Sequence, residues 1–368
     1  MCIIAGYSGN QNAAPILIEM MKKEEYVDGG LSTGIATIHE GKLYVRKVVG
    51  DVDTLLRETD ALDLPGTTGI IHSRTGGDYV QRAHPFTSNN GKIALLTNGT
   101  TRECACPEYY AKSNEVMAHF YNRGFEIKTA VDAADGVIPK HVLPNGKSYM
   151  MTEPYLFMIE EYLEGCSGEN MRDDIAKATR HAINTIPRNF LVANVHADIP
   201  DTVTVGTIAR PVSVGFSEGE TFFASLALAL PERAAKNPVV HLPPTTVAQI
   251  TPSGLDIKFT SIENARVEQI DYRIAAFVYN EMERMLTGKK DAPLSIYDLP
   301  FFSDWENVWS EPHIDSIYSS GVGCLKPYAP MMYEALWSFH KQGRLHSILG
   351  TKTTRSGKVN KITRFWLD

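Results

Sequence analysis

The second residue of this chain is a cysteine, within an opening segment that reads MCIIAGY. If the initiator methionine is removed, Cys2 carries a thiol and a free α-amine on one residue. A thiol becomes a strong nucleophile only when it is deprotonated, and an α-amine with a pKa of about 7.7–8.0 can accept that proton near neutral pH. Cys2 is therefore a candidate nucleophile with its own base, although an early cysteine can equally be a small buried core residue.

Three further segments carry polar residues at strand ends: GIIHSR at 69–74, AHPF at 83–86 and LLTNGT at 95–100. Each is ordinary when taken alone. An arginine at a strand end commonly forms a surface ion pair, a histidine before proline commonly has a structural role, and an Asn-Gly pair commonly makes a turn. Their order after an N-terminal cysteine is what gives them functional meaning.

As an ordered set, these segments resemble the class II glutamine amidotransferases, which are N-terminal-nucleophile hydrolases. The likeness is greatest to the glutaminase domain of the glucosamine-6-phosphate synthases, which opens with Met-Cys-Gly-Ile. That domain then carries Gly-x-x-His-Thr-Arg-Trp, Asn-Ala-His-Pro and His-Asn-Gly-Ile. The resemblance extends to GLSTGIA at 30–36 and to RGF at 123–125 followed by VD at 131–132. It covers roughly residues 2–262.

The resemblance implies a mechanism. Cys2 would attack the side-chain amide carbon of glutamine, with the oxyanion held by the Asn98 side-chain amide and the Gly99 backbone N–H. A planar guanidinium suits a carboxylate, so the matching arginine would hold the substrate α-carboxylate. Ammonia would leave first, and water would then release glutamate from a γ-glutamyl thioester. The positions that match the family's substrate-binding residues are Arg74, Asp132, His84 and Thr75, and the resemblance implies that Asp132 would hold the substrate α-ammonium.

Several positions depart from the family pattern. Ile3 replaces the glycine after the nucleophile, and Thr75 replaces the tryptophan after the arginine. A Thr-His pair that supports the substrate carboxylate is replaced by Gly77 and Asp78. An arginine that the synthases carry near the Glu25-Tyr26 position is missing, and this chain has Val27 and Asp28 there. Two alternatives therefore stand beside a glutaminase: a catalytically degenerate fold that binds an amino acid as a regulatory module, and an N-terminal-nucleophile hydrolase for another amide.

The apolar pattern predicts the elements that would position these residues. The predicted strands follow one another in antiparallel series, and the predicted helices fall into two separate groups, which indicates an α+β fold rather than alternating βαβ units. The resemblance implies an αββα sandwich of two antiparallel sheets between helix layers. We expect a glutaminase domain over residues 1–265 and a small, mainly helical, winged-helix-like appendage over 266–368. Apolar runs and helical periodicity predict strands at 3–7, 33–38, 42–49, 68–72, 93–97, 190–197, 203–209, 212–215, 221–225 and 247–250, and helices at 13–23, 155–163, 171–186, 275–286 and 331–340.

The last part of the chain has the order helix and then two-stranded hairpin, with a basic run. Such a run predicts either a wing that contacts nucleic-acid phosphates or a hairpin that docks on the rest of the protein or joins two copies of it. We favour docking, because the whole chain is acidic, and we expect no nucleic-acid partner. The aromatic stretch 301–309 is expected in the core or interface of this part. The basic residues are Arg344, Lys352, Arg355, Lys358, Lys361 and Arg364.

Composition bounds the remaining possibilities. With 368 residues and a formal net charge of -7, the chain has the composition of an ordinary globular protein and lacks a run of apolar residues long enough for a membrane span. Five scattered cysteines fit a reducing compartment, so we expect a cytoplasmic protein. Cys104 and Cys106 lack a second ligand pair, so we expect neither metal nor cofactor. The expected partners are glutamine or a related amide, a separate ammonia-accepting synthase subunit, and further copies of this chain.

Overall fold

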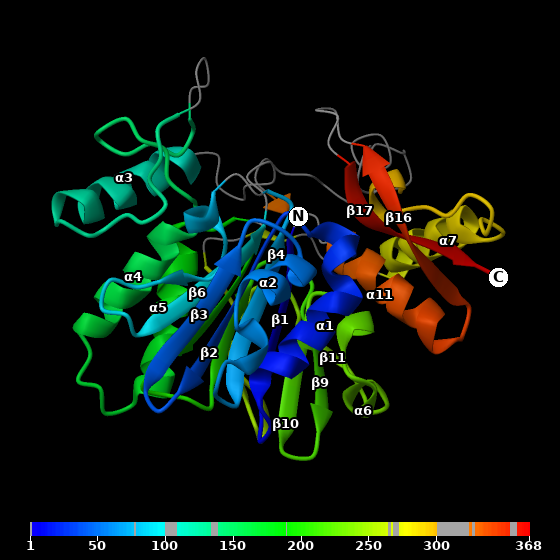
Figure 1. Ribbon diagram of the computed structural model, residues 1–368, viewed down its shortest axis with the longest axis horizontal. Coiled ribbons are helices and arrows are strands. Elements are labelled where there is room, and N and C mark those ends of the chain that lie inside the picture. Colours follow the sequence, from blue (N-terminus) through cyan, green and yellow to red (C-terminus); the bar gives the residue numbers. More distant parts are fainter. Residues whose placement is uncertain are drawn as a thin grey trace.

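The computed structural model describes residues 2–76, 79–99, 109–133, 139–188, 190–263, 266–267, 272–299, 324–325, 328–353 and 359–368. Two antiparallel sheets lie face to face, with helices on both outer faces (Figure 1). This arrangement confirms the α+β, αββα prediction for the larger part of the chain.

The first sheet has the strand order β11-β9-β10-β1-β4-β2-β3. Its strands, in chain order, are β1 (Cys2–Ser8), β2 (Ser32–His39), β3 (Lys42–Val48), β4 (Thr68–Arg74), β9 (Ser213–Ser217), β10 (Glu220–Ala224) and β11 (Val240–His241). The second sheet has the order β13-β12-β8-β7-β6-β5. Its strands are β5 (Phe86–Thr87), β6 (Ile93–Gly99), β7 (Phe190–His196), β8 (Val203–Thr207), β12 (Thr246–Thr251) and β13 (Gly254–Phe259).

The helices form an outer layer on each sheet. The described helices are α1 (Ala13–Asp28), α2 (Val52–Glu58), α3 (Tyr109–Asn122), α4 (Glu153–Glu164), α5 (Met171–Thr185), α6 (Glu232–Ala235), α7 (Tyr272–Leu286) and α11 (Tyr328–Lys341). Short 3₁₀ turns are η1 (Ala61–Asp63), η2 (Val80–Arg82), η3 (Ala227–Ala229) and η4 (Ile296–Asp298). Two small sheets are formed by β14 (Arg266–Val267) with β15 (Cys324–Leu325), and by β16 (Leu345–Thr353) with β17 (Val359–Leu367).

Alternation along the strands sorts side chains into three apolar layers, because successive residues of a strand point to opposite faces. In β1, Ile4 lies in the cluster between the two sheets, together with Leu96 of β6. Ile3 lies in the cluster under α1 and the C-terminal helices. The third cluster packs α3, α4 and α5 onto the outer face of the second sheet. A strand buried on both faces explains the continuous apolar run that begins the chain.

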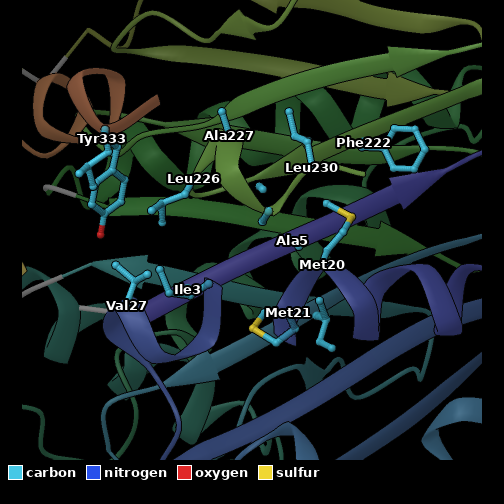
Figure 2. Packing of buried hydrophobic residues seen from close by; sticks show 14 of the residues in the cluster. Ile3, Ala5, Met20, Met21, Val27, Phe222, Leu226, Ala227, Leu230 and Tyr333 are labelled. Carbon is cyan, nitrogen blue, oxygen red and sulfur yellow. The ribbon is translucent and has the colours of Figure 1, made fainter. Parts of the chain in front are cut away.

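The C-terminal elements pack against α1. Figure 2 shows Tyr333 of α11 and Val27 of α1 near Ile3 of β1, and these residues belong to one buried cluster. That cluster also contains Met282 of α7 and Phe365 of β17. Helix α11 followed by the β16–β17 hairpin agrees with the predicted order of elements. The domain boundary at residue 265 and the winged-helix assignment stay predictions.

The basic residues of this hairpin form ion pairs within the chain. Lys361 Nζ lies 3.0 Å from Asp51 Oδ2, next to α2. Arg344 Nη1 lies 2.6 Å from Glu283 of α7, and Arg364 Nη1 lies 3.4 Å from Asp298 of η4. These contacts favour the docked hairpin over a nucleic-acid wing. Arg355, Lys358 and the aromatic stretch 301–309 lie outside the described residues.

Within the described part of the chain, no helix combines the length and the apolar composition that crossing a lipid bilayer requires.

Candidate functional site

Cys2 begins β1, a central strand of the first sheet. Its backbone pairs with Arg74, the last residue of β4, so the predicted nucleophile and the predicted carboxylate-binding arginine are cross-strand neighbours. The Cys2 side chain is half-buried. By alternation it shares a strand face with Ile4, and that face looks toward the second sheet. The sheet therefore directs the thiol toward β6.

Asn98 and Gly99 end β6 on the opposite sheet. The Asn98 side chain is buried, with 3% of its surface exposed, and its Oδ1 accepts a hydrogen bond from the Cys2 backbone N at 3.2 Å. Because the amide oxygen is used in this way, the Nδ2 group of Asn98 is left as the donor side of the same amide. The fold thus brings together Cys2 and Asn98, which are separated by 96 positions in sequence.

Ile3 does not occupy the space around the thiol. Its side chain is completely buried in the cluster under α1, where it lies near Val27 (Figure 2). Because Ile3 and Cys2 point to opposite faces of the strand, a branched side chain after the nucleophile adds to the helix-facing core. The departure from the family's glycine therefore leaves the Cys2 face unchanged.

Arg74 is half-buried at the end of β4, and its Nη1 donates to the Arg82 carbonyl at 2.9 Å. The Arg82 side chain in turn donates to the Thr129 and Ser148 carbonyls, at 3.0 and 2.9 Å. A Cβ added to Gly76 would lie 3.0 Å from Arg74 Nη2, so the loop passes directly over the guanidinium. Arg74 is thus fixed next to Cys2 by a chain of backbone acceptors.

Thr75 follows Arg74 and is exposed. It lines a cavity of about 200 Å³ together with Asp28 and Tyr297. Gly77 and Asp78, which replace the family's Thr-His pair, lie outside the described residues. Their effect on substrate binding stays a prediction.

His84 lies beneath the site in a buried polar network. Its ring stacks on Phe86 with centroids 4.5 Å apart, and its Nε2 is 2.8 Å from Thr152 Oγ1. Thr152 Oγ1 is 2.7 Å from Thr97 Oγ1, and His72 Nε2 is 3.1 Å from the Thr97 carbonyl. Because Thr97 precedes Asn98, this network fixes the strand that carries the amide. Its place therefore favours a supporting role for His84 rather than the predicted substrate contact.

Both histidines are held neutral by the fold. Burial lowers the pKa of His72 to about 3, with a smaller contribution from the charge of Arg74. Burial also lowers the pKa of His84 well below its usual value. A neutral His72 can donate its Nε2 proton to the Thr97 carbonyl. The network therefore requires that the imidazole rings of His72 and His84 both remain neutral.

Because the folded chain keeps His72 unprotonated, its free energy of unfolding is expected to decrease as the pH is lowered. The unfolded chain binds a proton at His72 below pH ~6.5, whereas the folded chain does so only near pH 3. Between those values the proton favours the unfolded state, by about 1.4 kcal/mol for each pH unit. We expect His72→Gln, which can keep a donor toward Thr97, to reduce the loss of unfolding free energy between pH 6.5 and pH 5.

Urea unfolding of both proteins at several pH values measures this difference. The comparison is needed because the buried carboxyls of Glu24, Glu25 and Asp28 have pKa values raised by burial, and they act with the opposite sign. Parallel pH curves for wild type and variant would contradict the assignment of a neutral buried imidazole.

Asp132 is in a different setting. Its side chain is 88% exposed, and its carboxylate lies 4.0 Å from Lys147 Nζ. Residues 134–138, which follow it, lie outside the described part of the chain. The predicted contact with the substrate α-ammonium stays a prediction.

Cys104 and Cys106 also lie outside the described residues, and among the residues that are described no cluster of three His, Cys, Asp or Glu side chains could hold a metal ion.

Two residues of this region, Asp28 and Tyr297, were not predicted from the sequence as functional candidates. Asp28 ends α1 and is 1% exposed, and the Tyr297 hydroxyl donates a hydrogen bond to its carboxylate. The loss of an arginine in this segment was visible in the sequence, but the pairing of Asp28 with Tyr297, 269 positions away, was not. Only the docking of the C-terminal elements brings the two together.

Curated proteins similar to this chain in sequence are glutamine–fructose-6-phosphate aminotransferases. A glutamine–fructose-6-phosphate aminotransferase of Thermosynechococcus vestitus is 30% identical over 261 residues, covering 70% of this chain and 36% of the relative. One of Pyrococcus horikoshii is 28% identical over 228 residues, covering 61% of this chain and 32% of the relative. This chain thus spans about a third of the length of these curated relatives. No family model matches it.

Among solved structures, the glutamine phosphoribosylpyrophosphate amidotransferase from B. subtilis, complexed with ADP and GMP, superposes with a TM-score of 0.52. It is 16% identical and covers 72% of this chain and 50% of its own, which supports the fold alone. The sequence relatives and the sandwich fold agree with one another. The recognition of this chain as similar to the class II glutamine amidotransferases, with homologues among the glutamine–fructose-6-phosphate aminotransferases, is confirmed.

Proposed function

We propose that this chain hydrolyses the side-chain amide of glutamine, with Cys2 as the nucleophile. The observation that carries the proposal is the contact across the two sheets between the Cys2 backbone N and Asn98 Oδ1. This contact supports a site in which the Cys2 thiol, the α-amine of a processed chain and the Asn98 amide act together. Homology to glutamine amidotransferases supports an amide substrate.

The chemistry follows from these groups. After removal of Met1, the Cys2 α-amine takes the thiol proton, directly or through a water, while sulfur bonds to the amide carbon. The carbonyl electron pair moves onto oxygen, where Asn98 Nδ2 and the Gly99 N–H stabilise it. Collapse of this intermediate breaks the carbon–nitrogen bond, and the departing nitrogen takes the proton from the ammonium. Water then cleaves the thioester to glutamate and restores the thiol.

Arg74 is the proposed carboxylate partner of the substrate, because its guanidinium is fixed beside Cys2. Asp132 and Thr75 are proposed to complete the substrate site. The ammonia acceptor is proposed to be a separate synthase subunit. We also retain the division into a glutaminase domain over 1–265 and an appendage over 266–368 as part of this proposal.

The test uses the whole chain and glutamine. We expect glutamate and ammonia in equal amounts, and γ-glutamyl hydroxamate when hydroxylamine is added, because hydroxylamine intercepts a thioester. Intact mass is expected to show that Met1 is absent. If glutamine binds by calorimetry but neither glutamate nor hydroxamate forms, the regulatory-module alternative replaces the enzyme.

A further inference from the structure

The end of α1 lies against the strand next to the nucleophile. The Gly30 N–H donates to Ser73 Oγ at 2.8 Å, and the Leu31 N–H donates to the Arg74 carbonyl at 2.9 Å. Arg74 is the cross-strand partner of Cys2. These bonds hold the residues that follow α1 beside the start of β1, and they place Asp28 at the nucleophile end of the sandwich.

Asp28 is a buried carboxylate that depends on a distant donor. Burial raises the pKa of this carboxyl, and the Tyr297 hydroxyl bond and the charge of Arg210 oppose that rise. A buried carboxylate without such partners would be costly. Tyr297 therefore helps to keep a negative charge at the end of α1.

Tyr297 is itself rigidly placed by the C-terminal strand. Leu294 and Phe365 of β17 exchange two backbone hydrogen bonds, at 3.0 and 2.7 Å. Ser295 and Asp298 form a capping box around η4, and Ile296 is fully buried. A 3₁₀ turn fixed on both sides holds its middle tyrosine in one position. The C-terminal segment thus reaches the N-terminal site through a defined contact.

The surroundings of Tyr297 connect it to the nucleophile as well as to Asp28. The ring lines the 200 Å³ cavity that Thr75 and Asp28 also line, and Lys352 Nζ lies 4.8 Å from the ring centroid. The pKa of Tyr297 is raised by burial, then by Asp28, and to a lesser degree by the charge of Cys2. Tyr297 is therefore within electrostatic range of the thiol.

We propose that Tyr297 is a positioning residue that holds Asp28 as a hydrogen-bond acceptor for the α-ammonium of Cys2. The inference rests on the proposed function, since it concerns the same nucleophile. An ammonium has three N–H groups, and Asn98 Oδ1 accepts from the Cys2 nitrogen already. A second, anionic acceptor fixes the rotation of the amine toward the sulfur. It also favours the charged amine and so raises its pKa, which makes the amine a stronger base for the thiol proton.

The first measurement is the pKa of the α-amine, read without catalysis. In a Cys2→Ala background the amine remains and the thiol no longer competes, so acetylation of the N-terminal residue at different pH values, followed by mass spectrometry, reports the amine. We expect Asp28→Asn and Tyr297→Phe each to lower this pKa by about one unit. The charged and titratable groups around the pair are unchanged in these variants: Arg74 of β4, Arg210 after β8, Tyr26 of α1, Tyr333 of α11, Lys352 of β16 and Lys361 of β17.

The second measurement is kinetic and uses the chain with Cys2 intact. We expect each variant to lower kcat about tenfold with KM within twofold, and the double variant to be no slower than the single ones, because Tyr297 acts through Asp28. Tyr279→Phe is the matched control. It removes a tyrosine hydroxyl that contacts Gln342 on the C-terminal helices at 2.9 Å, and it should change neither quantity.

The outcomes separate this inference from the proposed function. An unchanged amine pKa in both variants, or a native chain that retains Met1, overturns the role of Tyr297 and Asp28. A shifted amine pKa in a protein without Cys2-dependent glutamate release supports the inference and rejects the glutaminase. Additive losses of kcat in the double variant would show that Tyr297 does not act through Asp28.

Discussion

Replacement of Cys2 by alanine is expected to reduce glutamate release by about 10⁴-fold or more, since losing a covalent nucleophile leaves only binding and oxyanion stabilisation. The start of β1 is fixed by its pairing with β4 and by the Asn98 contact. Alanine in a half-buried position keeps these backbone interactions. The thermal unfolding midpoint should therefore change little while activity is lost.

Cys166 provides the matched control for this substitution. It is a second free cysteine, half-buried like Cys2, and its thiol lies 3.4 Å from the Tyr162 carbonyl at the end of α4. Cys166→Ala should retain full glutamate release and lose only a weak hydrogen bond. If Cys2→Ala keeps more than a tenth of the wild-type rate, the thiol of residue 2 is not the nucleophile.

Removal of the Asn98 amide is expected to lower kcat by about 10²–10³-fold, the usual effect of losing one oxyanion donor. Asn98 is buried and lies across from Cys2, so its Nδ2 is desolvated where the negative charge would develop. A donor that acts mainly on the tetrahedral intermediate changes kcat far more than KM. Steady-state kinetics of Asn98→Ala measure both constants.

Asn98→Asp separates the two functions of that side chain. The aspartate keeps an oxygen that can accept from the Cys2 nitrogen, but it replaces the Nδ2 donor with a second acceptor. We expect a loss at least as large as for alanine, because a carboxylate would repel the developing oxyanion. Normal activity in the aspartate variant would mean that Asn98 only orients Cys2.

The strands and helices of the sandwich could be predicted because their signals are local. Apolar runs placed β1, β2, β4, β6 and β7, and helical spacing placed α1, α4 and α5, to within a few residues. Alternation along β1 could also have assigned Ile3 to the helix-facing core, since its neighbour Ile4 faces the other sheet. The short helix α2 escaped prediction because its apolar residues are few.

The candidate site could be predicted only through the order of its motifs. Cys2, Arg74 and Asn98 lie on three strands, and no spacing in the sequence brings them together; the pairing of β1 with β4 and the stacking of two sheets do so. His84 matched a motif, but its environment is a buried network that the sequence does not reveal. Tyr297 lies beyond the range of the resemblance, so no motif pointed to it.

Because α1 and the C-terminal elements share one apolar core, removing the C-terminal part of the chain would expose part of that core. Met20 and Met21 of α1 are completely buried in a cluster that also contains Leu336 and Phe365. Expression of residues 1–265 would remove the C-terminal side chains from this cluster and leave part of its apolar surface facing solvent, and such patches promote self-association. A shortened protein used for crystallisation or assays would therefore be prone to aggregation. A fusion partner is better attached to the exposed Asp368 than used to replace residues 266–368.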